Sequence, residues 1–170
     1  MRAKRDNDAL LISLNDLEGQ LLHQVFRQLE AQYRLKPEDL DGATSQAWYS
    51  TRGSESALAT SDEVRDWVEH LHAFKAARLG NIEDWCRQLE LGIGKRLRLR
   101  VRLEDVPAFL GAINDHRLIV AARHDVGEEA MSLRTPEELA AQPEPRQEAL
   151  LEIHFLAWII EETLREMDGL

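Results

Sequence analysis

The stretch KRLRLRVRL, residues 95–103, decides the fold more than any other part of this chain of 170 residues. Apolar side chains occupy every second position and arginines the positions between them. The apolar set is Leu97, Leu99, Val101 and Leu103, and the arginine set is Arg96, Arg98, Arg100 and Arg102. This period of two predicts a strand with one buried face and one arginine face. A helix is predicted directly after it, from Glu104 to about Arg123.

A second strand-to-helix unit lies near the start of the chain. ALLISL, residues 9–14, alternates in the same way and predicts a short strand. Asn15, with Glu18 three residues later, has the spacing of a capping box, so a helix is predicted from about Asp16 to Arg34. Because a lone strand leaves its backbone groups unpaired, we expect Leu10–Leu14 to pair with Leu97–Val101 in a two-stranded sheet.

The other periodic segments have helical spacing. Helices are predicted to begin near Ser61, Asn81 and Pro145. The first of these carries the apolar stripe Val64, Trp67, Val68, Leu71, Phe74 and Ala77. Two segments are predicted as loops, residues 35–60 and residues 125–144. Trp48 and Tyr49 are expected to dock the first loop on the core, and the second is expected to contain a helical turn at residues 136–140.

These segments predict one domain over residues 1–170. Its class is mainly α, a bundle of four or five helices with a minor two-stranded β element. We expect the helices that begin near residues 16, 61, 104 and 145 to form the core.

Composition restricts the classes of function. The net charge of −10 argues against general affinity for nucleic acid or anionic membranes. Cys86 is the only cysteine, which excludes an internal disulfide and favours a reducing, cytoplasmic location. No apolar run approaches the ~20 residues of a membrane-spanning helix. The histidines are not spaced to share a metal ion, and no cofactor or catalytic constellation is predicted.

Two sets of residues are candidates for a site. The first is the arginine face, Arg96, Arg98, Arg100 and Arg102, which either meets a row of phosphates or is a solvated surface that blocks edge-to-edge aggregation. The second lies in INDHRLIVAARHDVG, residues 113–127, where Asn114 and Arg117 share one helical face and Asp115 points elsewhere.

Arg117 or Arg123 of this segment is predicted to pair with Glu161 or Glu162 of the last helix. Two interpretations of such a group stay open. It is either a buried polar network that fixes how two helices pack, or an anion-binding pocket.

The same segment resembles LNDLRLVLGTRLG of a bacterial family known as domain of unknown function 2017. The matching residues are Asn114, Asp115, Arg117, Leu118 and Arg123. HFLAWIIEETL, residues 154–164, is similar to the closing WLTWLQEEL helix of that family, with its acidic pair at Glu161 and Glu162. The resemblance covers nearly the whole chain and implies an all-helical fold. Actinobacterial genes of the family often lie beside the gene for ClpS, an adaptor of a ClpP-type protease, which implies a link to regulated proteolysis.

The sequence therefore predicts a non-enzymatic interaction module, an adaptor or regulator with a protein partner. One alternative is a nucleic-acid-binding regulator that uses the face from Arg96 to Arg102. The other is a small-anion binder or enzyme at Asn114, Arg117 and Arg123.

Overall fold

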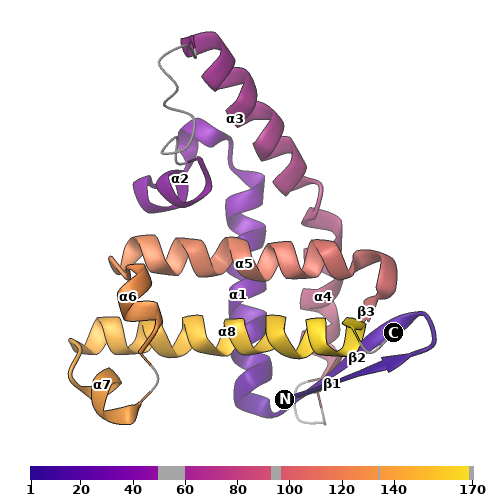
Figure 1. Cartoon of the computed structure of the whole chain (residues 1–170). Helices are drawn as coiled ribbons and strands as arrows, with labels where there is room; N and C mark the ends of the chain where they lie inside the picture. Colours follow the sequence, from indigo (N-terminus) through magenta and orange to yellow (C-terminus); the bar gives the residue numbers. More distant parts are fainter. Residues whose placement is uncertain (50–59, 93–96, 134, 169–170) are drawn as a thin grey trace.

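The computed structural model describes residues 1–49, 60–92, 97–133 and 135–168. The chain is mainly α-helical, with a small sheet at one end (Figure 1). In chain order the elements are β1 (Arg2–Asp6), β2 (Ala9–Leu14), α1 (Asp16–Arg34), η1 (Pro37–Asp39), α2 (Gly42–Tyr49), α3 (Ser61–Ala76), α4 (Leu79–Gly92), β3 (Leu97–Arg102), η2 (Leu103–Asp105), α5 (Val106–Arg123), α6 (Glu128–Met131), α7 (Pro136–Ala140) and α8 (Glu144–Asp168).

The predicted strand pairing is confirmed. β2 and β3 are antiparallel, with Leu10 opposite Val101 and Leu14 opposite Leu97. The sheet nevertheless has a third strand, because β1 pairs with β2 and gives the order β1-β2-β3. The sequence of β1, RAKRD, has a single apolar residue, so it shows no alternation from which a strand can be predicted.

Both edges of the sheet are covered by side chains from helices. On β3, the Gln88 side chain accepts from the backbone N of Arg100 at 2.8 Å and donates to its carbonyl oxygen at 3.2 Å. On β1, the backbone N of Arg5 donates to Glu166 of α8 at 3.4 Å. These contacts occupy backbone groups that an open edge would offer to another strand.

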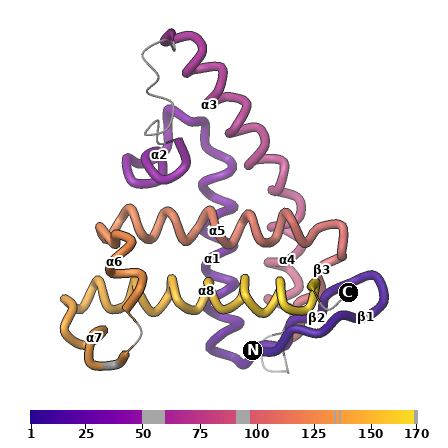
Figure 2. The backbone as a smooth tube through the Cα atoms, viewed as in Figure 1, coloured from indigo at the N-terminus to yellow at the C-terminus, as the bar shows by residue number. Residues whose placement is uncertain are grey.

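The core lies between the inner face of the sheet and helices α1, α4, α5 and α8. Three aromatic rings form its centre, with ring centroids 5.5 Å apart for Phe26 and Trp85, 5.3 Å for Trp85 and Phe109, and 6.2 Å for Phe26 and Phe109. A smaller cluster joins α5 to α8 near α6 and α7. The smooth trace shows α5 and α8 running side by side in opposite directions across α1 (Figure 2).

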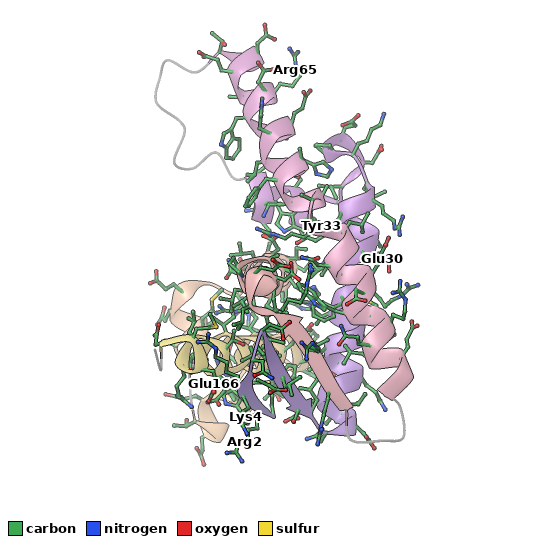
Figure 3. The ribbon with its side chains drawn as sticks, turned by 90° about the vertical axis from the view of Figure 1, so that its right-hand side faces the viewer. Arg2, Lys4, Glu30, Tyr33, Arg65 and Glu166 are labelled. Atoms are coloured by element: carbon green, nitrogen blue, oxygen red, sulfur yellow. The ribbon has the colours of Figure 1, made fainter. Side chains whose placement is uncertain are left out.

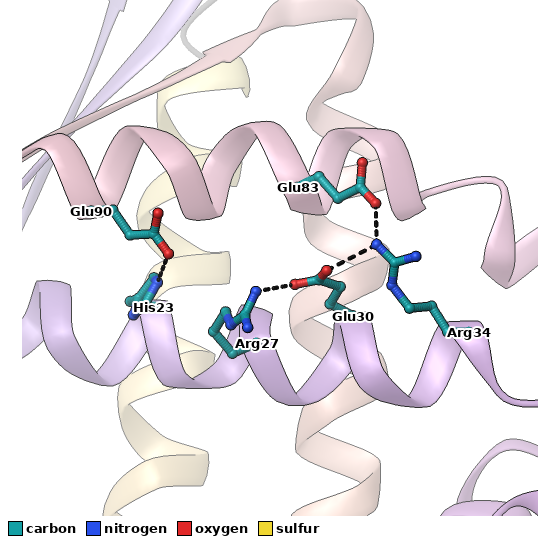
Figure 4. A network of polar contacts seen from close by, with 6 residues as sticks. All are labelled: His23, Arg27, Glu30, Arg34, Glu83 and Glu90. Carbon is teal, nitrogen blue, oxygen red and sulfur yellow. Dashed lines mark hydrogen bonds and ion pairs between the residues drawn. The ribbon is translucent and has the colours of Figure 1, made fainter.

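Helix α4 lies along α1, where polar pairs line the outer side of the contact (Figure 4). His23 is 3.2 Å from Glu90, and Arg34 is 2.5 Å from Glu83. Arg34 also pairs with Glu30 of its own helix at 3.0 Å. Exposed pairs of this kind contribute little stability, so the apolar side of α4 carries the packing.

The prediction that the helix near Ser61 belongs to the core is wrong. Helix α3 rises away from the body and meets it mainly at its C-terminal end (Figure 1). Lys75 is the only residue of α3 that is buried, while Trp67 is 42 % and Phe74 is 65 % exposed. The place in the core that was predicted for α3 is taken by α4, through Ile82, Trp85, Cys86 and Leu89.

The segment predicted as a loop over residues 35–60 contains η1 and α2, and residues 50–59 of it lie outside the described residues. Trp48 and Tyr49 are both buried, which confirms that they dock the segment on the core. The helical turn predicted at residues 136–140 is α7.

Candidate functional site

Asp115 is the centre of a buried cluster of charged and polar side chains. It lies midway along α5, and its side chain is 6 % exposed. Lys75 of α3 donates to Oδ1, while Arg78 donates to Oδ2 at 2.5 Å and Tyr33 of α1 donates to Oδ2 at 2.7 Å. Arg78 stands between α3 and α4, so one carboxylate joins α1, α3 and the start of α4 to α5.

Helix α2 is joined to the same cluster. The indole N of Trp48 donates to the backbone carbonyl of Asp115 at 3.2 Å, and the Lys75 ammonium lies 5.1 Å from the centroid of the Trp48 ring. Next to it, the Tyr49 hydroxyl and Nδ1 of His72 are 2.7 Å apart. The C-terminal end of α3, called its base below, is therefore held by polar contacts on the sides that face α2 and α5.

Gly111 makes room for the Arg78 guanidinium. A Cβ at this position of α5 would lie 2.7 Å from Cζ of Arg78. The other side of the guanidinium faces the Phe74 ring, whose centroid is 5.0 Å away. The absence of a side chain at Gly111 thus permits the approach of Arg78 to Asp115.

The cluster holds two cations and one anion, and both cationic side chains are largely buried. Removing such charges from water is costly unless each is paired and hydrogen-bonded, as they are here. Burial, followed by the negative charge of Asp115, raises the pKa of Tyr33 far above its ordinary value and that of Tyr49 to about 12. Both phenols therefore keep their protons at neutral pH.

The oxygens of Asp115 already accept three hydrogen bonds, and its side chain has almost no contact with solvent. A carboxylate in this state is poorly suited to take a proton from a substrate. The arrangement is instead suited to fixing the direction in which α3 leaves the body.

The predicted polar network does not assemble as expected. Among the described residues, no hydrogen bond or ion pair joins any two of Asn114, Arg117, Arg123, Glu161 and Glu162. Asn114 and Glu161 are exposed, and Glu162 pairs with Arg165 of its own helix. Burial lowers the pKa of Arg117, whereas the negative charge of Glu161 tends to raise it.

Arg123 pairs with Asp41 rather than with a glutamate of α8. Its Nη2 donates to Oδ2 of Asp41 at 2.9 Å. Asp41 also accepts from the backbone N of Thr44 at 2.9 Å and from its hydroxyl at 2.8 Å, which places Asp41 as the cap of α2. The backbone hydrogen bond from Thr44 is the main reason that the pKa of Asp41 falls from 3.8 to about 2.

The arginine face of β3 is present but is partly neutralised. Arg98, Arg100 and Arg102 alternate with three buried apolar residues, as predicted, and Arg96 lies outside the described residues. Arg100 pairs with Asp8 at 2.6 Å. Arg102 pairs with Glu104 at 2.8 Å and with Asp105 at 2.6 Å. Two of the three described guanidinium groups are therefore already matched by carboxylates.

The described residues also include the one cysteine of the chain. Cys86 is buried, and burial raises the pKa of its thiol to about 11, so it is mostly a neutral thiol at pH 7. In the part of the chain that the structure describes, no three or more His, Cys, Asp or Glu side chains gather where they could hold a metal ion. None of its described helices combines the length and the apolar character needed to cross a membrane.

The fold and the site define a class of protein. It is mainly α-helical, has a buried charge cluster centred on Asp115, and carries one projecting helix, α3. The sequence model of the family described as Domain of unknown function (DUF2017) matches residues 1–167. The chain belongs to this family. No curated protein and no solved structure matched the chain.

Proposed function

We propose that this protein is a non-enzymatic interaction module that presents α3 to a partner protein. The observation that carries the proposal is the exposure of two large aromatic side chains, Trp67 and Phe74, on a helix that is fixed at its base. They are seven residues apart, which is about two helical turns, so they lie on one side of α3 roughly 10 Å from each other. Exposed aromatic side chains held on a rigid element are typical anchors of protein interfaces.

The charges on α3 indicate the chemistry of the partner. Its exposed part carries Asp62, Glu63, Asp66 and Glu69 against a single arginine, Arg65. Asp62 pairs with Arg65 at 3.1 Å, which leaves an excess of negative charge along the helix. The partner that fits is an apolar groove with lysine or arginine at its rim, and we expect association to slow as salt is raised.

The Asp115 cluster supports the same function. A docking helix loses less entropy on binding when its orientation is fixed beforehand. Asp115, Lys75 and Arg78 hold the C-terminal end of α3. Arg78 lies against one face of the Phe74 ring, which is still 65 % exposed. The buried charges are thus a positioning device for α3 in this proposal.

Site-specific photo-crosslinking in cells tests the proposal. A photoreactive phenylalanine analogue at Trp67 is expected to form an adduct with one defined protein. The same analogue at Ala73, exposed on a different side of α3, is the matched control and should give no such adduct. Phe74→Ala, which adds no charge beside Arg78, should strongly weaken the Trp67 adduct. Equal adducts from both positions, or none from Trp67, would contradict the proposal.

The resemblance to a family whose genes neighbour that of ClpS makes this adaptor the first partner to test. Isothermal calorimetry with purified ClpS is expected to show binding that Phe74→Ala weakens at least tenfold. Absence of binding would remove the link to proteolysis, and the crosslinking result would still decide whether α3 is a docking helix.

A further inference from the structure

We propose that the outer face of the sheet binds a single phosphoryl group between Arg2, Lys4 and Arg98. A hollow of about 450 Å³ lies on this face, lined by these three cations together with Asp6, Leu11 and Ser13. A neighbouring hollow of about 360 Å³ shares Arg2, Ser13 and Arg98 with it. Arg2 and Lys4 are seen together at the opposite end of the molecule from Arg65 of α3 (Figure 3).

The strand register brings the cations around one hydroxyl group. Arg2 of β1 is opposite Ser13 of β2, and Ser13 is opposite Arg98 of β3. Neighbouring strands are about 4.8 Å apart, so Arg2 and Arg98 flank Ser13 on the outer face. Lys4 is two residues further along β1 and therefore points to the same face. The exposed Ser13 hydroxyl supplies a donor between the two guanidinium groups.

The charge at this end of the sheet is not neutralised by the protein. Arg2, Lys4 and Arg98 form no ion pair with any residue in the described ranges, whereas Arg100 and Arg102 of the same face do. With Asp6 counted, the lining of the hollow still carries a net charge of +2, a local positive potential in a chain of net charge −10. An anion seated in the hollow would match this charge.

A phosphoryl dianion fits this group better than other anions do. Its oxygens accept two-pronged hydrogen bonds from guanidinium groups and a further one from a hydroxyl. Further along the same face Arg100 and Arg102 are already paired with carboxylates, so the unpaired cations do not continue as a track for an extended polyanion. None of the residues that line the hollow is aromatic, so it offers no surface on which a nucleic-acid base could stack.

An NMR titration of the ¹⁵N-labelled full chain with inorganic phosphate tests the site. The backbone amide signals of Ser13 and Arg98 are expected to shift together and to saturate. Arg98→Gln should weaken the affinity about tenfold. Arg100→Gln, an exposed arginine of the same strand that is already paired, is the matched control and should change it less than twofold. Non-saturating shifts, or equal losses in both variants, would overturn the proposal.

Two further titrations distinguish the sources of the phosphoryl group. A phosphoserine peptide that binds at least tenfold more tightly than inorganic phosphate at the same amides would identify a phosphorylated protein as the source. Equal affinities would identify a small phosphate compound, and either result supports the site. A single-stranded oligonucleotide of about 12 nucleotides is the third ligand. If it binds more tightly than the peptide and inorganic phosphate, with an affinity that falls steeply with salt, the assignment to one phosphoryl group is overturned. Neither outcome bears on α3, which lies at the other end of the molecule.

Discussion

Helices α3 and α4 follow one another in the chain and have similar amphipathic patterns, yet the apolar side of α4 is buried and that of α3 is largely exposed. Trp85 of α4 is 2 % exposed and packs between Phe26 and Phe109. Trp67 of α3 is 42 % exposed. The comparison shows that an apolar stripe at helical spacing does not by itself determine how deeply the helix is buried in its own chain.

The length of α1 explains the difference. Helix α4 lies along α1 and buries its stripe there, whereas α3 extends beyond the end of α1 at Arg34 (Figure 1). Helix α3 reaches the body mainly near its C-terminal end, where Lys75 is buried and bound to Asp115. Val68 and Leu71 are partly buried against the core. The chain thus holds α3 at one end and leaves Trp67 and Phe74 largely exposed.

Truncation of the two tryptophans gives the largest expected contrast. Trp85→Ala should lower the free energy of unfolding by about 3–5 kcal/mol, because it empties the centre of the aromatic cluster. Trp67→Ala, the matched variant in α3, should change it by less than about 1 kcal/mol. Urea unfolding followed by circular dichroism measures both. Similar losses in the two variants would show that α3 is packed as α4 is.

Removal of the central carboxylate should have the next largest effect. Asp115→Asn leaves Lys75 and Arg78 without a counter-charge and should cost about 3 kcal/mol. Asp84→Asn breaks an exposed pair with Arg87 at 3.5 Å and keeps an oxygen that can accept from Gln88. It is the control, with an expected cost below about 0.5 kcal/mol. If the two variants unfold at the same urea concentration, the cluster does not hold α3.

The cap of α2 has an effect that depends on pH. Asp41→Ala should cost about 1 kcal/mol at pH 7, since it removes the cap. Folding lowers the pKa of Asp41 from 3.8 to about 2, so its stabilising effect is complete above pH 4 and is lost as the pH falls through 2. The difference between wild type and Asp41→Ala in urea midpoints should shrink across that range. A difference that grew toward low pH would have the wrong sign.

The smallest expected effect tests the fit between Gly111 and Arg78. Gly111→Ala displaces the guanidinium from Asp115, which outweighs the helix propensity of alanine and should cost about 0.5–1 kcal/mol. In an Arg78→Ala background the same change should instead stabilise the protein by a similar amount. An identical effect in both backgrounds would mean that the missing side chain at Gly111 is not what makes room for the Arg78 guanidinium.

Much of the fold could be predicted from local patterns. The capping box of α1 at Asn15 and Glu18 is present, and the pairing of Leu10–Leu14 with Leu97–Val101 has the expected partners. Both depend on interactions between near neighbours or on strict alternation. Strand β1 could not be predicted, because its place depends on the edge of β2 and not on a pattern of its own.

The buried charge cluster was missed for a different reason. The sequence of residues 113–127 predicts a polar group, but places it at Asn114 and Arg117 and not at Asp115. A signal was present, since Asp115 is three residues after Ala112 and four before Ile119, both of which are buried. An acid at the spacing of an apolar stripe indicates a buried partner. That the partners are Lys75 and Arg78 depends on the crossing of α3 and α5, which local spacing does not determine.

Native-state hydrogen exchange of α3 and α4 tests the central contrast most directly. Amides of residues 66–70 in α3 are expected to exchange through local openings that cost at least about 2 kcal/mol less than those of residues 82–89 in α4. The crosslinked partner should then slow exchange in α3 without changing α4. Equal protection of the two helices in the free protein would contradict the account, because α3 would then be as firmly packed as the core.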